Sequence, residues 1–202
     1  MQVMQGEGRA RLSADPSGGP VAQQRRRRLL VLFVAVAAIV FAVDQVTKAW
    51  AMATLVDAPP RQLIGDFLTL ELVRNPGAAF SLGTGSTWLL TVLAVVILIV
   101  LVRTSRRLGS TGWAWAFGLI LGGALGNLVD RLIREPGFGR GHVVDFLDYN
   151  GWFIGNVADI AIVAAAVLIA LLAFLGIGLD GRRDTGEARG IPDERGGATR
   201  DG

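Results

Sequence analysis

Long apolar stretches alternate with short polar segments along the chain, and this alternation predicts four membrane spans. The stretches cover residues 29–50, 88–102, 113–133 and 153–179, and the second, which is the shortest, extends towards Ser86. A helix of about 20 apolar residues crosses the hydrocarbon core of a bilayer, and runs of about 18 or more indicate a span rather than a soluble core. We therefore expect a mostly α-helical, polytopic membrane protein without a separate soluble domain.

A shorter period appears between the first two spans, in residues 61–85. Every second residue from Leu68 to Leu72 is leucine, which is typical of a short strand at the membrane surface. The sequence NPG at 75–77 then signals a turn. Such a strand either belongs to an ordinary hairpin or offers a free edge to an extended peptide, and composition alone favours the hairpin. A small extracytoplasmic β element is therefore expected here.

Composition separates the ends of the chain from its middle. Of all 202 residues, 51% are hydrophobic and only 18% are charged. Residues 1–24 and 180–202 are instead rich in Gly, Asp, Glu and Arg and poor in large apolar side chains. Such segments cannot bury enough surface to fold. We expect two disordered cytoplasmic tails around a membrane domain of residues 25–179.

Arginines gather at three places that four spans put on one side of the membrane. They lie before the first span (25–28), after the second (103, 106 and 107) and after the fourth (182 and 183). Because cytoplasmic segments are enriched in Lys and Arg, both termini are expected in the cytoplasm. Arg131, Arg134 and Arg140 lie on the other side and need a local explanation.

The first basic run and the apolar stretch behind it also resemble a cleavable signal peptide, with Ala51-Met52-Ala53 as the cleavage site. Two observations favour a retained span instead. Asp44 and Lys48 interrupt the apolar stretch, and the basic run starts far from the N-terminus.

The residue types present exclude several kinds of catalysis. The chain has no cysteine, so disulfides, thiol nucleophiles and zinc–thiolate sites are excluded. Its one histidine, His142, cannot form an HExxH motif, and no serine has a Gly-x-Ser-x-Gly context. We expect no metal, no cofactor and no nucleic-acid partner. Carboxylates remain as the candidates for chemistry.

Ionisable residues inside spans cost about 2.5–3.5 kcal/mol each on insertion scales and need an explanation. Asp44 and Lys48 are spaced i,i+4 in the first span, with the acid first, as an intrahelical ion pair prefers. They either neutralise each other or hold neighbouring helices at a site, and the sequence leaves both readings open.

The third span carries a polar stripe at its outer end. Its members share one helix face: Asn127, Asp130, Arg131 and Arg134. Other turns carry small residues that let helices approach closely: Gly118, Gly122, Gly123 and Gly126. The stripe is either a cap that faces water and headgroups or the lining of an inward-facing pocket, and the glycines favour the pocket.

More carboxylates follow in "GHVVDFLDYNGWFIGNVAD", residues 141–159. Asp145 and Asp148 are expected in a short outer loop, and Asp159 in the first turn of the fourth helix. Asn156 lies one turn before Asp159. The helix dipole alone explains an acid at this position. However, capping requires only one or two polar side chains, whereas five polar or ionisable residues are expected at the same membrane level: Asp44, Asn127, Arg131, Asp145 and Asp159.

Four separated motifs resemble those of bacterial lipoprotein signal peptidases, the type II signal peptidases. They are "DQVTK" at 44–48, "NPGAAFSLG" at 75–83, "GGALGNLVDRL" at 122–132 with "VVDF" at 143–146, and "NVADIAI" at 156–162. The resemblance implies an intramembrane aspartyl endopeptidase in the bacterial plasma membrane, with its active site at the outer face. It implies diacylglyceryl-modified prolipoproteins as substrates, cut before the lipidated cysteine, with membrane lipid and a globomycin-type inhibitor as further partners.

The resemblance also assigns roles to residues. It makes Asp145 and Asp159 the catalytic pair. The residues that it places in the pocket are Asn75, Gly77, Asn127, Arg131 and Asn156, with Asp44 and Lys48 in support. Asp130 is expected to form a structural ion pair in the same supporting group, and Asp148 matches no motif. The chain departs from the family pattern at Gly155, where phenylalanine is common, and in a shorter segment between the two aspartates.

A different class of function remains as the alternative. A small ion or proton transporter could use Asp44, Asp130 and Asp159 as a relay. Such a relay needs ionisable groups across the whole membrane depth, whereas these cluster at one end. A non-enzymatic scaffold would explain the glycines but not the carboxylates.

Overall fold

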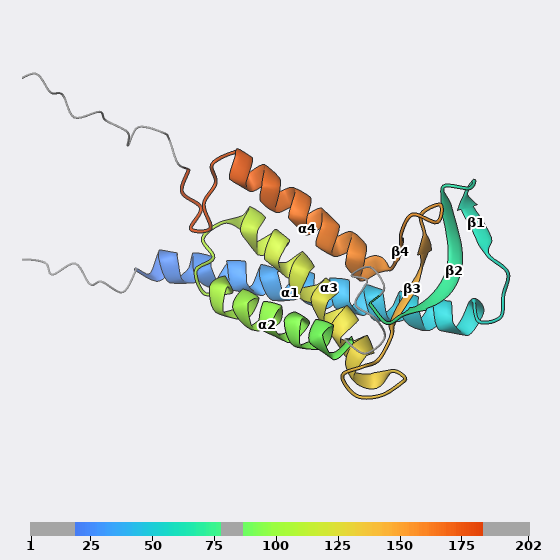
Figure 1. Cartoon of the computed structure of the whole chain (residues 1–202). Helices are drawn as coiled ribbons and strands as arrows, with labels where there is room; N and C mark the ends of the chain where they lie inside the picture. Colours follow the sequence, from blue (N-terminus) through green and yellow to red (C-terminus); the bar gives the residue numbers. More distant parts are fainter. Residues whose placement is uncertain (1–18, 78–86, 184–202) are drawn as a thin grey trace, which may run out of the picture.

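The computed structural model describes residues 19–77 and 87–183, in which four long helices lie side by side and a small sheet lies at one end of them (Figure 1). The helices are α1 (Pro20–Thr54), α2 (Thr87–Ser105), α3 (Thr111–Ile133) and α4 (Val157–Phe174). Each is long and apolar enough to cross a membrane. The predicted fold, four membrane-length helices with a small β element, is confirmed.

The predicted boundaries need three corrections. Helix α1 already begins at Pro20, because proline fits the first turn of a helix, where its missing N–H is not needed. After α4 the chain folds back through residue 183 of the predicted tail, where Arg183 pairs with Ile177 and the N–H of Gly178 donates to the carbonyl of Arg182 (2.9 Å). Helix α4 starts at Val157 and not at residue 153, since the preceding residues pair as a strand. The rest of both predicted tails lies outside the described residues.

Helix α3 is the central helix of the bundle, and its glycines explain why. A Cβ on Gly122 would lie 2.6 Å from the carbonyl oxygen of Ala37 in α1. A Cβ on Gly123 would lie 2.7 Å from the carbonyl oxygen of Ala158 in α4. Because no side chain fits at either place, the glycines let three backbones touch, as their spacing predicts.

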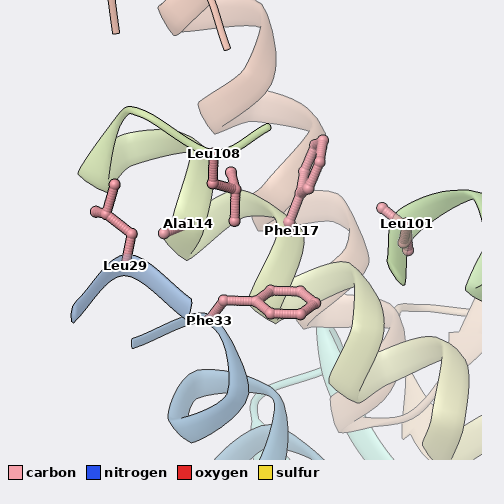
Figure 2. Close-up of a cluster of buried hydrophobic side chains, with 6 residues drawn as sticks. All are labelled: Leu29, Phe33, Leu101, Leu108, Ala114 and Phe117. Carbon is pink, nitrogen blue, oxygen red and sulfur yellow. The ribbon is translucent and has the colours of Figure 1, made fainter. Parts of the chain in front are cut away.

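Away from the sheet, an apolar cluster joins the helices (Figure 2). The side chains of Leu29 and Phe33 come from α1, and Ala114 and Phe117 come from α3. Leu101 of α2 and Leu108, in the following loop, complete the cluster. Apolar packing dominates this end of the bundle, with a few hydrogen bonds from side chains to backbone carbonyls, such as that from Arg25 to Gly109 (2.7 Å).

The sheet has the strand order β1-β2-β3-β4, and every pair of neighbours is antiparallel. Its strands are β1 (Arg61–Ile64), β2 (Leu68–Asn75), β3 (Val143–Asp148) and β4 (Ile154–Gly155). Strand β2 is paired on both sides, so the hairpin interpretation is right and a free β2 edge is excluded. Residues 78–85 of the predicted β element lie outside the described residues.

The prediction that Asp145 and Asp148 lie in a loop is wrong, since both belong to β3. The strand forms because residues 143–148 pair with β2, with Asp145 opposite Val73. Val144 and Phe146 of β3 are buried in a second apolar cluster, which includes Ala51 of α1 and Leu55 directly after this helix. Because neighbouring strand residues point to opposite faces, this packing turns Asp145 away from that cluster.

Candidate active site

Asp159 is fixed by the local sequence at the start of α4. The side-chain oxygen of Asn156 accepts from the N–H of Asp159 (3.2 Å), and Oδ2 of Asp159 accepts from the N–H of Asn156 (3.0 Å). This reciprocal capping box satisfies two N–H groups that the helix leaves unpaired. It leaves Oδ1 of Asp159 directed at Asn127, whose Nδ2 donates to it (3.1 Å).

Asp145 reaches the same place from β3. Its Oδ2 accepts from Nδ2 of Asn75 (2.8 Å), and its Oδ1 accepts from Nδ2 of Asn156 (2.7 Å). Asn156 therefore holds both acids, Asp145 through its side chain and Asp159 through its backbone. Both carboxylates line one central cavity of about 340 Å³ with several other candidates: Asn75, Gly77, Asn127 and Arg131.

Burial changes the acidity of Asp145. The residue is only 2% exposed, and burial raises its pKa from 3.8 to about 6. Hydrogen bonds from Asn75 and Asn156 and the charge of Lys48 oppose this rise in pKa, whereas repulsion from Asp159 adds to it. Two carboxylates held in one cavity resist simultaneous ionisation, so the pair can retain one proton near neutral pH.

Lys48 orients the side chain of Asn127, which contacts Asp159. Its fully buried ammonium group pairs with Asp44 (2.9 Å) and Asp130 (2.8 Å), and it donates to Oδ1 of Asn127 (2.8 Å). An ammonium group can only donate, so the amide oxygen of Asn127 must face it. The amide nitrogen of Asn127 then faces Asp159.

The two supporting acids also join separate elements. Oδ1 of Asp44 accepts from the N–H of Ala158 (3.0 Å), which ties α1 to the start of α4. Asp130 pairs with Arg134 (2.6 Å) and accepts from the N–H of Val144 in β3 (3.2 Å). The Asp44–Lys48 pair thus neutralises itself and also holds neighbouring helices. Asp130 forms the structural ion pair that the sequence predicts.

Arg131 differs from these partners because it lines the central cavity and its Nε is unsatisfied. Within the described part of the chain, this buried nitrogen has no hydrogen-bond partner. Asp148 does not line the central cavity, and its Oδ1 accepts from the N–H of Gly151 in a turn (2.8 Å). Across residues 19–77 and 87–183, no group of three or more His, Cys, Asp or Glu side chains is arranged to hold a metal ion.

Phe153 also lines the central cavity and is not among the residues that the sequence motifs predict. The turn between β3 and β4 brings it there, and Asn150 (φ 54°) and Gly151 (φ 74°) both have left-handed backbones. Asn-Gly is the preferred pair for a hairpin turn of this kind. This dipeptide is the signal that could have predicted the return of the chain to the site.

Comparisons with known proteins identify the family of the chain. A sequence model of the family described as "Signal peptidase (SPase) II" matches residues 36–175. The chain is 52% identical to a lipoprotein signal peptidase of Rhodococcus jostii over 84% of this chain and 85% of that protein. It is 48% identical to one of Mycobacterium avium over 84% and 94%. A solved bacterial membrane enzyme is similar with a TM-score of 0.60 and 30% identity, over 70% of this chain and 91% of that one.

Proposed function

The chain belongs to the signal peptidase II family, and from this membership and the paired carboxylates we propose that it is an intramembrane aspartyl endopeptidase that removes signal peptides from prolipoproteins. One observation carries the proposal. Asp145 from β3 and Asp159 from α4 line the same cavity, and Asn156 holds both. Paired carboxylates of this kind hydrolyse peptide bonds without a metal or a covalent nucleophile.

The reaction follows from sharing one proton between two acids. The ionised carboxylate removes a proton from a water molecule, whose oxygen attacks the scissile carbonyl carbon. The protonated carboxyl group donates a hydrogen bond to the carbonyl oxygen as negative charge develops there. When the C–N bond breaks, the leaving nitrogen takes a proton from the pair and the carboxyl product forms. Arg131 and the asparagines orient the acids and the substrate backbone.

Two features support a lipid-bearing substrate. A groove of about 410 Å³, the α4 groove, is lined by Asp159 and mostly apolar neighbours. Ile160 and Val163 in this groove are 48% and 61% exposed, on a helix of membrane length whose exposed apolar face suits contact with acyl chains. We infer that the diacylglyceryl group of the precursor cysteine enters here from the bilayer. A globomycin-type inhibitor would compete for the same space.

The distribution of arginine supports an orientation. The described arginines at 25–28, 103, 106, 107, 182 and 183 lie at or beyond the helix ends opposite the sheet. Cytoplasmic segments carry such an excess of positive residues. We infer that both ends of the membrane domain face the cytoplasm and that the carboxylate pair faces the outer side of the plasma membrane.

The transporter alternative is not favoured. Within the helices, residues 29–43, 88–102, 111–129 and 160–174 contain no ionisable side chain. A proton or ion relay needs such groups along its path. The carboxylates of these helices, Asp44, Asp130 and Asp159, instead lie near the sheet together with Lys48.

The test is cleavage of a synthetic diacylglyceryl-modified precursor by the purified protein in detergent. Asp145→Asn and Asp159→Asn are each expected to lower kcat by about 10²–10⁴-fold, because each removes one acid–base group. Both variants should still elute as monodisperse, folded protein. Near-normal turnover by either variant would contradict the assignment. Proton flux through proteoliposomes, measured in parallel, should be absent, and flux without peptidase activity would favour the transporter.

A further inference from the structure

Three hollows meet at the side chain of Phe153. The first is the α4 groove and the second is the central cavity. The third, the sheet cleft, has a volume of about 290 Å³ and is lined from β2, β3 and the β3–β4 turn, including Arg74, Asn75 and Asp145. Among the residues that line these three spaces, Phe153 is the one that all three share.

The two acids of the catalytic pair line different spaces, one the α4 groove and the other the sheet cleft. Asp159 lines the α4 groove but not the sheet cleft, and Asp145 lines the sheet cleft but not the α4 groove. The α4 groove is mostly apolar, whereas the sheet cleft offers amide, guanidinium and carboxylate groups. The two spaces therefore suit different parts of a substrate, and Phe153 lies where they join.

Phe153 is held by Tyr149 and lies against Gly155. The backbone carbonyl of Phe153 accepts from the N–H of Tyr149 (2.8 Å), and the rings of the two residues stack with centroids 6.2 Å apart. The ring of Phe153 also lies close to the backbone of Gly155, which has no side chain. A Cβ there would lie 2.5 Å from Cε1 of Phe153 and 2.9 Å from Oδ2 of Asp159. The ring thus occupies space that a side chain at residue 155 would need, directly beside a catalytic carboxylate.

We propose that Phe153 is a specificity-determining residue that confines the acyl chains of the substrate to the α4 groove and its peptide backbone to the sheet cleft. The proposal rests on the proposed function. With the ring in place, long acyl chains cannot enter the sheet cleft, so the scissile bond stays centred on the pair. Without the ring the two spaces merge, and long chains gain unproductive positions.

The experiment compares two precursors that differ only in acyl length, dihexanoyl and dipalmitoyl, in one detergent. Phe153→Ala is expected to raise KM for the dipalmitoyl precursor about tenfold while kcat stays within threefold. KM for the dihexanoyl precursor should change less than threefold, because short chains cannot span both spaces. Phe153→Tyr, which keeps the ring, should restore the wild-type constants.

Phe67→Ala is the matched control. Phe67 contacts Tyr149 edge-on (6.3 Å) but lines none of the three spaces, so both constants should stay within twofold of wild type. An equal loss of kcat on both precursors by Phe153→Ala would overturn the proposal, since it would mean that the ring only supports Asp159. If Phe153→Ala does not fold, Phe153→Leu decides by the same ratio of KM values. A wild-type protein that cuts neither precursor would instead refute the proposed function.

Discussion

Two groups of acids lie side by side in this protein and have opposite kinds of partners; three of the four acids are fully buried and Asp159 is half-buried. In the supporting cluster, Asp44 and Asp130 face Lys48 and Arg134, so two negative charges meet two positive charges at 2.6–2.9 Å. In the proposed catalytic pair, the hydrogen bonds to Asp145 and Asp159 come from neutral amides.

The difference lies in how the cost of a buried charge is met. A cation in contact with a buried carboxylate offsets that cost, and removal of either partner leaves the other uncompensated. A buried carboxylate that accepts only neutral donors bears more of the cost of its own charge, as the raised pKa of Asp145 reflects. The supporting cluster therefore fixes geometry, whereas in the proposed catalytic pair Asp145 keeps its proton to a higher pH than an ordinary aspartate.

The largest effect is expected from breaking the charge balance with Lys48→Met. Removal of one partner from a buried ion pair costs about 3–5 kcal/mol, since it leaves an uncompensated charge. The free energy of unfolding in detergent should fall by about this amount. Because Asn127 loses the contact that orients it, kcat should also fall.

Two variants sharpen this test. Asp44→Asn/Lys48→Met removes one charge of each sign and should be more stable than Lys48→Met alone. Arg134→Met also takes a cation from Asp130 but does not touch Asn127, so its kcat should stay within about threefold of wild type. Equal losses of kcat in Lys48→Met and Arg134→Met would mean that Lys48 contributes charge alone and does not position Asn127.

An intermediate effect is expected from Arg131→Ala, which removes the cation that lines the central cavity. A hydrogen bond to a charged group contributes about 1.5–3 kcal/mol, so kcat/KM should fall roughly 10–100-fold. Asp148→Ala serves as the control, because Asp148 serves a turn outside the cavity. Asp148→Ala should retain kcat/KM within about twofold. Similar losses of kcat/KM in both variants would show that the roles proposed for Arg131 and Asp148 are wrong.

The smallest effect concerns pH. The side-chain amide of Asn75 donates to Asp145 and stabilises its ionised form, so Asn75→Ala raises the pKa of Asp145 further above about 6. Activity needs the shared proton, so the high-pH limb of kcat/KM should move to higher pH. One hydrogen bond of about 1 kcal/mol corresponds to about half to one pH unit. Gln62→Ala, which removes an exposed amide far from the site, should leave the limb unchanged, and a shift to lower pH in Asn75→Ala would contradict this account.

Much of the molecule could be predicted from short-range patterns. The apolar runs determine four spans, because a bilayer accepts only helices of that length and composition. The spacing of Asn156 and Asp159 determines a capping box within one turn, and the glycines of the third span determine close helix contacts. These features depend on neighbours within a few residues, so one sequence suffices to read them.

The tertiary structure decided which distant groups meet. Asp145 lies on a strand because it pairs with β2, and its partner Asn75 is 70 residues away. Lys48 contacts α3 although its helical spacing predicts only Asp44. Phe153 lies between three spaces because the turn at Asn150-Gly151 returns the chain, its ring stacks on Tyr149, and Gly155 has no side chain. The periodicity of apolar residues predicts that a residue is buried. The identity of its neighbours depends on contacts between distant segments, which only the folded chain defines.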